Sequence, residues 1–307
     1  MKAGKIIGTI NLLITSALIL ATFVLSASRQ QALAGDLPEV QKAGVLRHLG
    51  VPYANFVTGS GDGLDMELIK LFADHLGVRY EYIKTDWDNA ISDLTGKQIR
   101  VAKGEVTTVG EAPVKGDVIA NGMTIIPWRQ KVLDFSQPTF PTQVWLVAKA
   151  DSAISPITPA GDTMKDIVLT KEALRGISTM GKLKTCLDPD LYQLSDYTAK
   201  ITIFDGALND LAPAILSGKS ETTILDVPDA LVALEKWPGQ LKVIGPISDK
   251  QEMGAAFAKT SPLLRNAFNK FFEIIKADGT YSKLVNKYYP EVFSFYPEFF
   301  SKQQISQ

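Results

Sequence analysis

Strand-like and helix-like segments alternate along most of this chain, and that alternation limits the folds open to it. Residues 45–49 have the composition of a buried strand, apolar side chains recur at helical spacing over residues 64–76, and residues 79–83 alternate as a second strand. The same order returns later, with strands at 200–204 and 222–225, helices at 208–216 and 228–234, and closing helices at 262–275 and 281–288. Such alternation builds sheets covered by helices, so we expect an α/β protein with two halves.

The first 34 residues predict export. Lys2 and Lys5 precede an apolar run over residues 6–25, and Ala32 and Ala34 place small residues at the spacing that a signal peptidase requires. We therefore assign residues 1–34 as a signal peptide. The apolar run is also long enough to span a bilayer, so an N-terminal membrane anchor is the alternative. Both interpretations predict a periplasmic location.

Charge and composition exclude several classes of function. The chain has 33 acidic and 32 basic residues, and the basic ones occur singly, which argues against nucleic acid as a partner. Two histidines and a single cysteine, Cys186, offer no cluster with metal-ligand spacing and no internal disulfide. No motif has the spacing of a nucleophile elbow or a dinucleotide-binding loop. We therefore predict no metal, no cofactor and no catalytic residue.

A turn suited to an anion follows a short strand at residues 118–120. Asn121, Gly122 and Thr124 form the turn, and Arg129 comes after a proline, where a helical turn would begin. Backbone N–H groups at a helix start, a threonine hydroxyl and a guanidinium fork together suit a carboxylate. The alternative is a solvated surface arginine after an ordinary turn.

Several motifs resemble those of periplasmic solute-binding proteins that serve polar amino-acid ABC importers. They are PYANF at 52–56, GLDMEL at 63–68, the segment 122–136 around the anion turn, SGK at 217–219 leading to LDVP at 225–228, and ADGTY at 277–281. The resemblance implies a type II periplasmic-binding fold with two α/β lobes joined by two crossing strands. It places lobe 1 at residues 36–141 and 253–307 and lobe 2 at residues 142–252.

The resemblance also implies a ligand site. An α-amino acid carries a carboxylate, an ammonium and a side chain, so its receptor needs a donor fork, an acid and a shaped wall. Arg129 would clamp the carboxylate, with Thr124 and the turn at Asn121 and Gly122 donating as well. Asp226 would take the ammonium from the opposite lobe.

Aromatic rings are the predicted walls of that site. Tyr53 matches the family position whose ring covers the ligand, and Trp87 and Trp128 are further candidates. The alternative for both tryptophans is packing in the core or at its rim. Asp226 also has an alternative role, as the N-cap of a helix that begins before Pro228.

Three segments depart from the family's pattern. In lobe 2, Thr185 matches the hydroxyl of a ligand-contacting turn, but Lys184 stands where the family has glycine. Residues 98–116 are an insertion that we expect to form a small hairpin or ordered loop, either as an ornament on lobe 1 or as a flap for a partner. Beyond Tyr289, the tail carries five further aromatic side chains, which we expect to pack against lobe 1.

These features predict the periplasmic substrate-binding component of an ABC importer. Its partners would be a small-molecule ligand, an amino acid or another carboxylate, and an inner-membrane ABC permease, and we expect a monomer. An accessory or sensor protein of the same fold is one alternative, favoured by the insertion and the aromatic tail. A periplasmic dehydratase of a cyclic acid is another, with Asp226 or Glu252 as its acid or base.

Overall fold

The computed structural model describes residues 34–102, 104–198 and 200–304, so residues 1–33 of the predicted export segment lie outside the described residues. Within the described residues, no helix is long and apolar enough to cross a membrane. The described part contains two five-stranded sheets, each with its own helices, and a two-stranded link between them. The expectation of two α/β halves is therefore confirmed.

The first sheet has the strand order β2-β1-β5-β14-β6. Its strands are β1 (Val45–Gly50), β2 (Arg79–Lys84), β5 (Val118–Ile119), β6 (Leu133–Phe135) and β14 (Ala256–Ala258). β1 pairs in parallel with β2 and with β5, so the loops that follow these strands share one edge of the sheet. β14 pairs antiparallel with β5 and β6. We call the half built on this sheet lobe 1.

The helices of lobe 1 bury one apolar face each. They are α2 (Leu37–Ala43), α3 (Leu64–Leu76), α4 (Ala90–Thr95), α5 (Pro127–Gln130), α9 (Pro262–Ala277) and α10 (Thr280–Tyr288). In α9, Phe268, Phe271 and Phe272 lie on the buried face, at the spacing of one helical stripe. α3 has the bounds that its apolar periodicity predicts, and α4 is shorter than the helix expected near residues 88–94.

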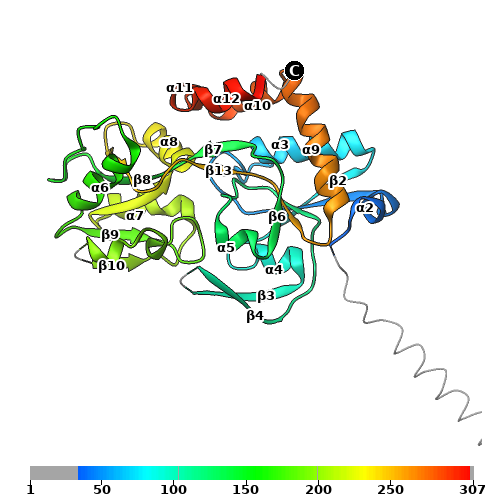
Figure 1. Cartoon of the computed structure of the whole chain (residues 1–307), viewed down its shortest axis with the longest axis horizontal. Coiled ribbons are helices and arrows are strands. Elements are labelled where there is room, and N and C mark those ends of the chain that lie inside the picture. Colours follow the sequence, from blue (N-terminus) through cyan, green and yellow to red (C-terminus); the bar gives the residue numbers. More distant parts are fainter. Residues whose placement is uncertain (1–33, 103, 199, 305–307) are drawn as a thin grey trace, which may run out of the picture. The chain divides into compact units, whose positions relative to one another are not determined.

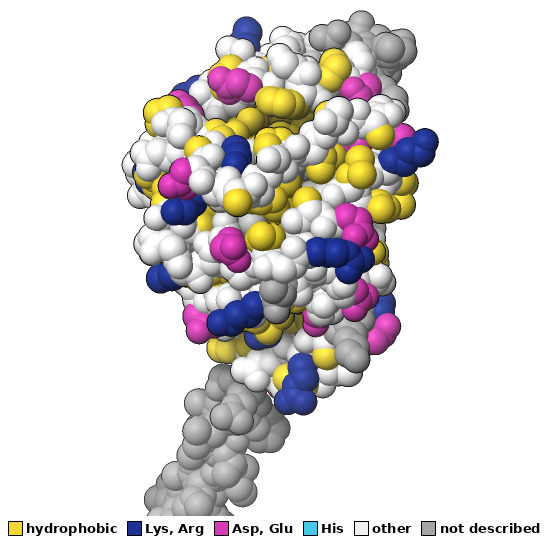
Figure 2. All heavy atoms as spheres, turned by 90° about the vertical axis from the view of Figure 1, so that its left-hand side faces the viewer, with side chains coloured by type: hydrophobic (Ala, Val, Ile, Leu, Met, Phe, Trp, Pro, Cys, Tyr) yellow, Lys and Arg dark blue, Asp and Glu magenta, His cyan; other side chains and the backbone are white. Residues whose placement is uncertain are grey.

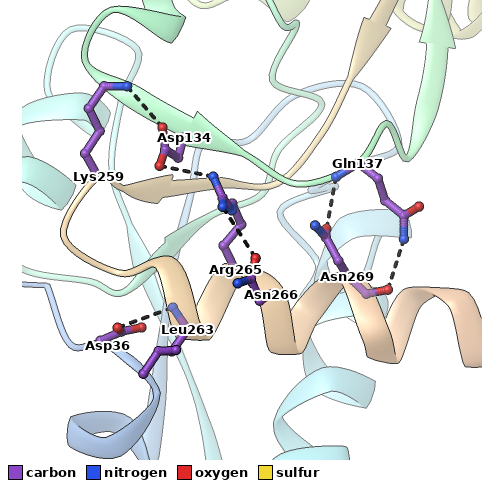
Figure 3. A network of polar contacts seen from close by, with 8 residues as sticks. All are labelled: Asp36, Asp134, Gln137, Lys259, Leu263, Arg265, Asn266 and Asn269. Atoms are coloured by element: carbon purple, nitrogen blue, oxygen red, sulfur yellow. Dashed lines mark hydrogen bonds and ion pairs between the residues drawn. The ribbon is translucent and has the colours of Figure 1, made fainter.

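A network of polar contacts fixes α9 to the rest of lobe 1 (Figure 3). Asp134 of β6 accepts hydrogen bonds from Lys259 at 3.0 Å and from Arg265 at 3.1 Å. The Asn269 side chain accepts from the Gln137 backbone N–H at 3.0 Å, and its backbone carbonyl accepts from the Gln137 side chain. Because residues 134–137 lead directly into the strands that join the two halves, the network holds α9 beside that link.

The insertion at residues 98–116 contains a hairpin. β3 (Lys97–Ala102) pairs antiparallel with β4 (Glu105–Glu111), with a register irregularity between Gln98 and Ile99. Lys131 donates a hydrogen bond to the Gly104 carbonyl at 3.2 Å, which attaches the hairpin to the segment after α5. The hairpin that the sequence predicts is thus present on lobe 1.

The second sheet has the strand order β10-β9-β11-β8-β12. Its strands are β8 (Val144–Lys149), β9 (Ser178–Gly181), β10 (Lys200–Ile203), β11 (Thr222–Asp226) and β12 (Leu241–Pro246). Its helices are α6 (Thr163–Ala173), α7 (Leu211–Leu216) and α8 (Val227–Lys236), with short 3-10 turns η1 (Pro189–Tyr192), η2 (Leu194–Asp196) and η3 (Leu208–Asp210). We call this half lobe 2.

On the face drawn in Figure 2, basic and acidic side chains are interspersed.

Two strands run between the sheets and pair with each other. β7 (Phe140–Thr142) and β13 (Gln251–Met253) are antiparallel, with Pro141 opposite Glu252 (Figure 1). Glu252 is exposed, and its backbone carbonyl accepts a hydrogen bond from the Ile125 N–H at 2.8 Å. The anion turn is therefore joined directly to one of the strands that link the lobes.

The aromatic tail contacts both lobes, which corrects the expectation that it packs on lobe 1 alone. α11 (Val292–Phe295) and α12 (Pro297–Gln304) form its ordered part. Tyr289 packs against Phe56 and Phe140, with ring centroids 5.1 and 5.0 Å away. Phe295 instead lies against Trp145 of β8 in lobe 2, at 5.7 Å. The two contacts come from different parts of the tail, because Tyr289 directly follows α10 whereas Phe295 ends α11.

Candidate ligand-binding site

The turn after β5 brings polar side chains into the interior between the lobes. Asn121 and Thr124 are fully buried, and Gly122 has a positive φ of 66°. A Cβ at Gly122 would lie 2.4 Å from the Phe56 ring, so only glycine fits there without displacing that ring. Thr124 forms a backbone bridge with Met253 of β13. Backbone geometry therefore fixes the turn on both sides.

The backbone N–H of Gly122 does not face the site, contrary to our expectation that it donates to a ligand. It donates to the Asp65 carboxylate at 2.7 Å. Burial raises the pKa of Asp65 to about 7, and the hydrogen bond from Gly122 opposes that rise. Asp65, in the first turn of α3, thus accepts the Gly122 N–H that the family resemblance assigned to the ligand.

Arg129 is a buried cation held between two aromatic rings. Its side chain is 1% exposed, and Nη1 donates to the Thr124 carbonyl at 2.9 Å. The guanidinium carbon lies 5.5 Å from the Trp87 ring centre and 5.3 Å from that of Trp128, within the range of cation–π contacts. Nε has no hydrogen-bond partner among the described residues. The alternative of a solvated arginine is therefore wrong, and burial lowers the pKa of Arg129.

Other buried polar atoms, in the anion turn and on Trp87, also lack hydrogen-bond partners within the described part of the chain. They are both side-chain amide atoms of Asn121, Thr124 Oγ1 and Trp87 Nε1. A buried donor or acceptor without a partner costs about 1–3 kcal/mol, so native proteins rarely collect several in one place. The Thr124 hydroxyl and the Trp87 indole N–H belong to residues that contact Arg129, so both are donors that an anionic ligand beside this cation would satisfy.

Asp226 lies at the end of β11, on the lobe 2 side of the same interior. Its Oδ2 accepts from Tyr53 Oη at 3.2 Å and from Cys186 Sγ at 2.8 Å, and its Oδ1 accepts from Thr142 Oγ1 at 3.4 Å. Although Asp226 occupies the N-cap position of α8, its carboxylate makes no capping hydrogen bond to the described residues. Burial raises the pKa of Asp226 to about 6, and these hydrogen bonds oppose the rise.

Tyr53 covers the site from lobe 1 and takes part in closing it. The residue is fully buried, its ring stacks on Phe56, and the Trp87 ring meets it edge-on at 5.6 Å. Two further contacts join the lobes: the Ala54 N–H donates to Asn209 at 2.9 Å, and Lys184 pairs with Asp88 at 3.2 Å. The arrangement is a closed one.

Thr185, the predicted lobe 2 hydroxyl, is engaged within its own turn. Its Oγ1 donates to the Lys182 carbonyl at 2.8 Å and accepts from the Leu187 N–H at 3.0 Å. The next residue, Cys186, reaches Asp226 instead. Tyr192 was also missed, although its hydroxyl donates to the Cys186 carbonyl at 2.5 Å. The only sequence signal for either residue was the uncertain register after β9.

A second hollow adjoins the site at the hairpin. Its volume is about 500 Å³, and Trp128, Leu191, Asp188 and the hairpin residue Val101 line part of it. Trp128 also contacts Arg129, so the hollow and the buried polar cluster share this residue. Within the described residues, no group of three or more His, Cys, Asp or Glu side chains could hold a metal ion.

The fold and the site together define a two-lobe protein built to enclose a small polar ligand. Residues 113–291 match the family model of bacterial extracellular solute-binding proteins, family 3. The chain belongs to this family, and the predicted type II periplasmic-binding fold is confirmed by its similarity to solved amino-acid-binding proteins.

Three comparisons place the chain among its relatives. It is 26% identical to the probable amino-acid ABC transporter-binding protein of Haemophilus influenzae over 89% of this chain and 95% of that protein. It is 27% identical to membrane-bound lytic murein transglycosylase F of Desulfosudis oleivorans over 76% of this chain, but it spans only 45% of that enzyme. The crystal structure of the ancestral amino acid-binding protein AncCDT-1, a precursor of cyclohexadienyl dehydratase, superposes with a TM-score of 0.63 at 26% identity, covering 82% of this chain and 98% of that one.

Proposed function

We propose that this protein is the periplasmic substrate-binding component of an ABC importer and that its ligand is an α-amino acid. The supporting observation is the pairing of a buried cation and a buried acid on different lobes. Arg129 comes from α5 in lobe 1, and Asp226 from the end of β11 in lobe 2. A zwitterion presents the two complementary charges that such a pair accepts.

Binding would couple to closure. The ligand carboxylate would accept from Arg129 Nε, which has no partner among the described residues, and from Thr124. Its ammonium would bind Asp226 in place of the hydrogen bonds that Tyr53 and Cys186 now donate. Because the two charged groups sit on different lobes, only the closed form engages both ends of one ligand, and the ligand shifts the open–closed equilibrium toward that form. We propose that residues 36–141 with 253–307 and residues 142–252 move as the two lobes, about β7 and β13.

A thermal-shift and calorimetry screen tests the proposal. The panel holds amino acids, dicarboxylates and cyclic acids, applied to protein stripped of carried-over ligand. Ligand at about 1,000 times its Kd adds roughly 4 kcal/mol of stability, which raises the Tm by several degrees. A shift confined to one class of amino acid would support the proposal and name the cargo. No shift across the panel would contradict it.

Arginine variants then locate the site. Arg129→Ala should weaken binding by at least about 100-fold, since it removes charge-assisted hydrogen bonds worth roughly 1.5–3 kcal/mol each. Arg129→Lys should restore little, because lysine lacks the planar fork. Arg175→Ala is the matched control: Arg175 is exposed on lobe 2, where it pairs with Glu172 and lies over the Tyr197 ring. Unchanged affinity in Arg129→Ala would show that the anion site lies elsewhere.

A second candidate role is that of an accessory or sensor protein that uses the same fold to control an enzyme or a signalling system. Two observations favour it: the tail contacts both lobes, where it would report their separation, and one relative carries a similar segment within a longer lytic enzyme. A permease and an ATPase gene beside this one would support transport. An oxidoreductase or histidine kinase gene in that place would support the second role.

We propose no catalytic activity for this chain. A dehydratase would need a proton donor or acceptor beside the bound carboxylate. Asp226 is buried and hydrogen-bonded on both oxygens, while Glu252 is exposed on β13. Incubation of the protein with cyclic hydroxy acids, followed by mass spectrometry, tests this directly: loss of water from any of them would contradict the proposal.

A further inference from the structure

The only cysteine of the chain lies beside the acid of the candidate site. Cys186 is 1% exposed, and its Sγ lies 2.8 Å from Asp226 Oδ2. The residue before it, Thr185, turns back into its own loop, so Cys186 is the residue of this loop that reaches the acid. A cysteine in this position is open to two roles: packing within lobe 2, or contact with a ligand.

Independent features on lobe 1 point to a ligand at this place. Arg129 is almost fully buried, yet its Nε has no partner among residues 34–102, 104–198 and 200–304, and the same holds for both amide atoms of Asn121. Burial lowers the pKa of Arg129, and Cys186 and Asp226, when ionised, raise it, so both groups face the same buried region as the guanidinium. The thiol contacts the proposed ammonium-binding group directly and shares this region with the proposed carboxylate-binding group.

The chemistry of a thiol limits what it can do there. Burial raises the pKa of Cys186, so the group stays a neutral thiol in the closed form and adds no charge of its own. A thiol is a weak hydrogen-bond donor that behaves as a small apolar group. Beside two strongly polar partners, its main effect is therefore to occupy space.

We propose that Cys186 is a ligand-contacting residue whose bulk sets the space for the bound amino acid between Arg129 and Asp226, and that its thiol is accessible only when the lobes separate. The inference rests on the proposed function, because it takes the ligand to be an α-amino acid held by those two residues. It makes Cys186 both a determinant of specificity and a site where chemical modification prevents closure.

A size series at position 186 tests the first part. Calorimetry with the amino acid identified by the ligand screen is carried out on the wild type, Cys186→Ala, Cys186→Ser and Cys186→Leu. Cys186→Ala and Cys186→Ser should stay within about tenfold of the wild type, whereas Cys186→Leu should bind roughly 10- to 100-fold more weakly because it overfills the site. A leucine variant that binds within twofold of the wild type would overturn the inference.

Thiol labelling of the unmodified chain tests the second part and does not depend on the folding of a variant. The Cys186 thiolate adds across the double bond of N-ethylmaleimide, forming one C–S bond, and the neighbouring carbon takes a proton from water. Saturating ligand should slow this reaction by about tenfold or more, because opening must precede it. The adduct should no longer bind ligand. Labelling that is equally fast with and without ligand, or an adduct with unchanged affinity, would overturn the inference.

A matched control places the single thiol on the surface. In the double variant Cys186→Ser with Val168→Cys, the cysteine lies on α6 at a position that is 52% exposed. It should be labelled at the same rate with and without ligand, and the labelled protein should still bind. If the wild type binds nothing on the panel, the proposed function fails and this inference with it. If the wild type binds but the leucine variant and the adduct bind equally well, this inference alone fails.

Discussion

The Tyr53 hydroxyl of lobe 1 donates a hydrogen bond to the Asp226 carboxylate of lobe 2 at 3.2 Å, across the interior that a ligand would fill. Tyr53 comes from the loop after β1, and Asp226 ends β11, so the two are 173 residues apart in the chain. The protein thus supplies a partner of its own to the acid. A ligand ammonium would have to compete with this contact, and the same contact favours closure of the lobes.

Tyr53→Phe should therefore increase the open population of the ligand-free protein. The lost hydrogen bond is worth about 0.5–1.5 kcal/mol, enough to shift a balanced equilibrium several-fold. The radius of gyration from small-angle X-ray scattering should rise. Tyr80→Phe is the matched control, because the Tyr80 hydroxyl bonds to His48 at 2.8 Å within lobe 1 alone. An equal change in both variants would show that Tyr53 does not join the lobes in solution.

Ligand affinity should fall as the pH is lowered through about 6. Burial raises the pKa of Asp226 to about 6, from an ordinary value of 3.8. An ammonium ligand binds the charged form, so binding is complete above that pKa and weakens by up to tenfold per pH unit below it. Calorimetry between pH 4.5 and 8 measures the profile. In Asp226→Asn, affinity should be weak throughout and the step near pH 6 should vanish; a step that persists would assign the titration to another group.

Asp226 contributes to folding stability with the opposite dependence on pH. Because the pKa of Asp226 is higher in the folded than in the unfolded state, the folded protein binds more protons between pH 4 and 6. The contribution of this group to stability is therefore greatest at low pH and declines as the pH rises through that window. The contribution of Asp226 to stability should accordingly change with pH in opposite directions in the ligand-free and the ligand-bound protein.

Periodicity in the sequence was enough for the first regular elements of lobe 1, because burial of one face determines them. The apolar stripe of residues 64–76 predicts α3 with its observed bounds, and residues 79–83 predict β2 to within a residue. The aromatic tail shows the limit of prediction from sequence patterns. Its composition predicts burial, but only the folded chain decides that Phe295 meets Trp145 of lobe 2.

Residues of the candidate site were predictable where their chemical type identifies them. They were not predictable where the path of the backbone decides which side chain reaches the site. Arg129, Thr124, Tyr53 and Asp226 lie around one interior, as their motifs suggest. Cys186 was not predicted because Lys184, in the loop after β9, has a positive φ of 61°. Residues other than glycine seldom adopt this backbone conformation, and the sequence does not reveal it. The engagement of the Gly122 N–H by Asp65 was also out of reach, since that contact joins residues 57 positions apart.

Tyr289 should carry most of the stability that the tail contributes. It is 2% exposed, packs against Phe56 and Phe140, and accepts a hydrogen bond on its hydroxyl from the Asn55 N–H at 2.8 Å. Tyr289→Ala should lower the free energy of unfolding by about 3–5 kcal/mol, the usual loss for a buried aromatic side chain. Phe295→Ala, at a position that is 47% exposed, should cost less than about 1 kcal/mol. Urea denaturation measures both, and equal losses would contradict this division of the tail.

Gly122→Ala should destabilise the protein more than Gly77→Ala, although the two glycines have nearly the same backbone conformation, with φ of 66° and 69°. The shared left-handed conformation costs alanine about 1–2 kcal/mol at either position. At Gly77, which ends α3, a Cβ would meet no described atom within 4 Å, whereas at Gly122 it would lie 2.4 Å from the Phe56 ring. Overpacking adds roughly 1–3 kcal/mol there, and it displaces the ring on which Tyr53 stacks. Gly122→Ala should therefore also weaken ligand binding, while Gly77→Ala leaves it unchanged. If urea denaturation gave equal losses for both variants, the close approach of Gly122 to Phe56 would not exist in solution.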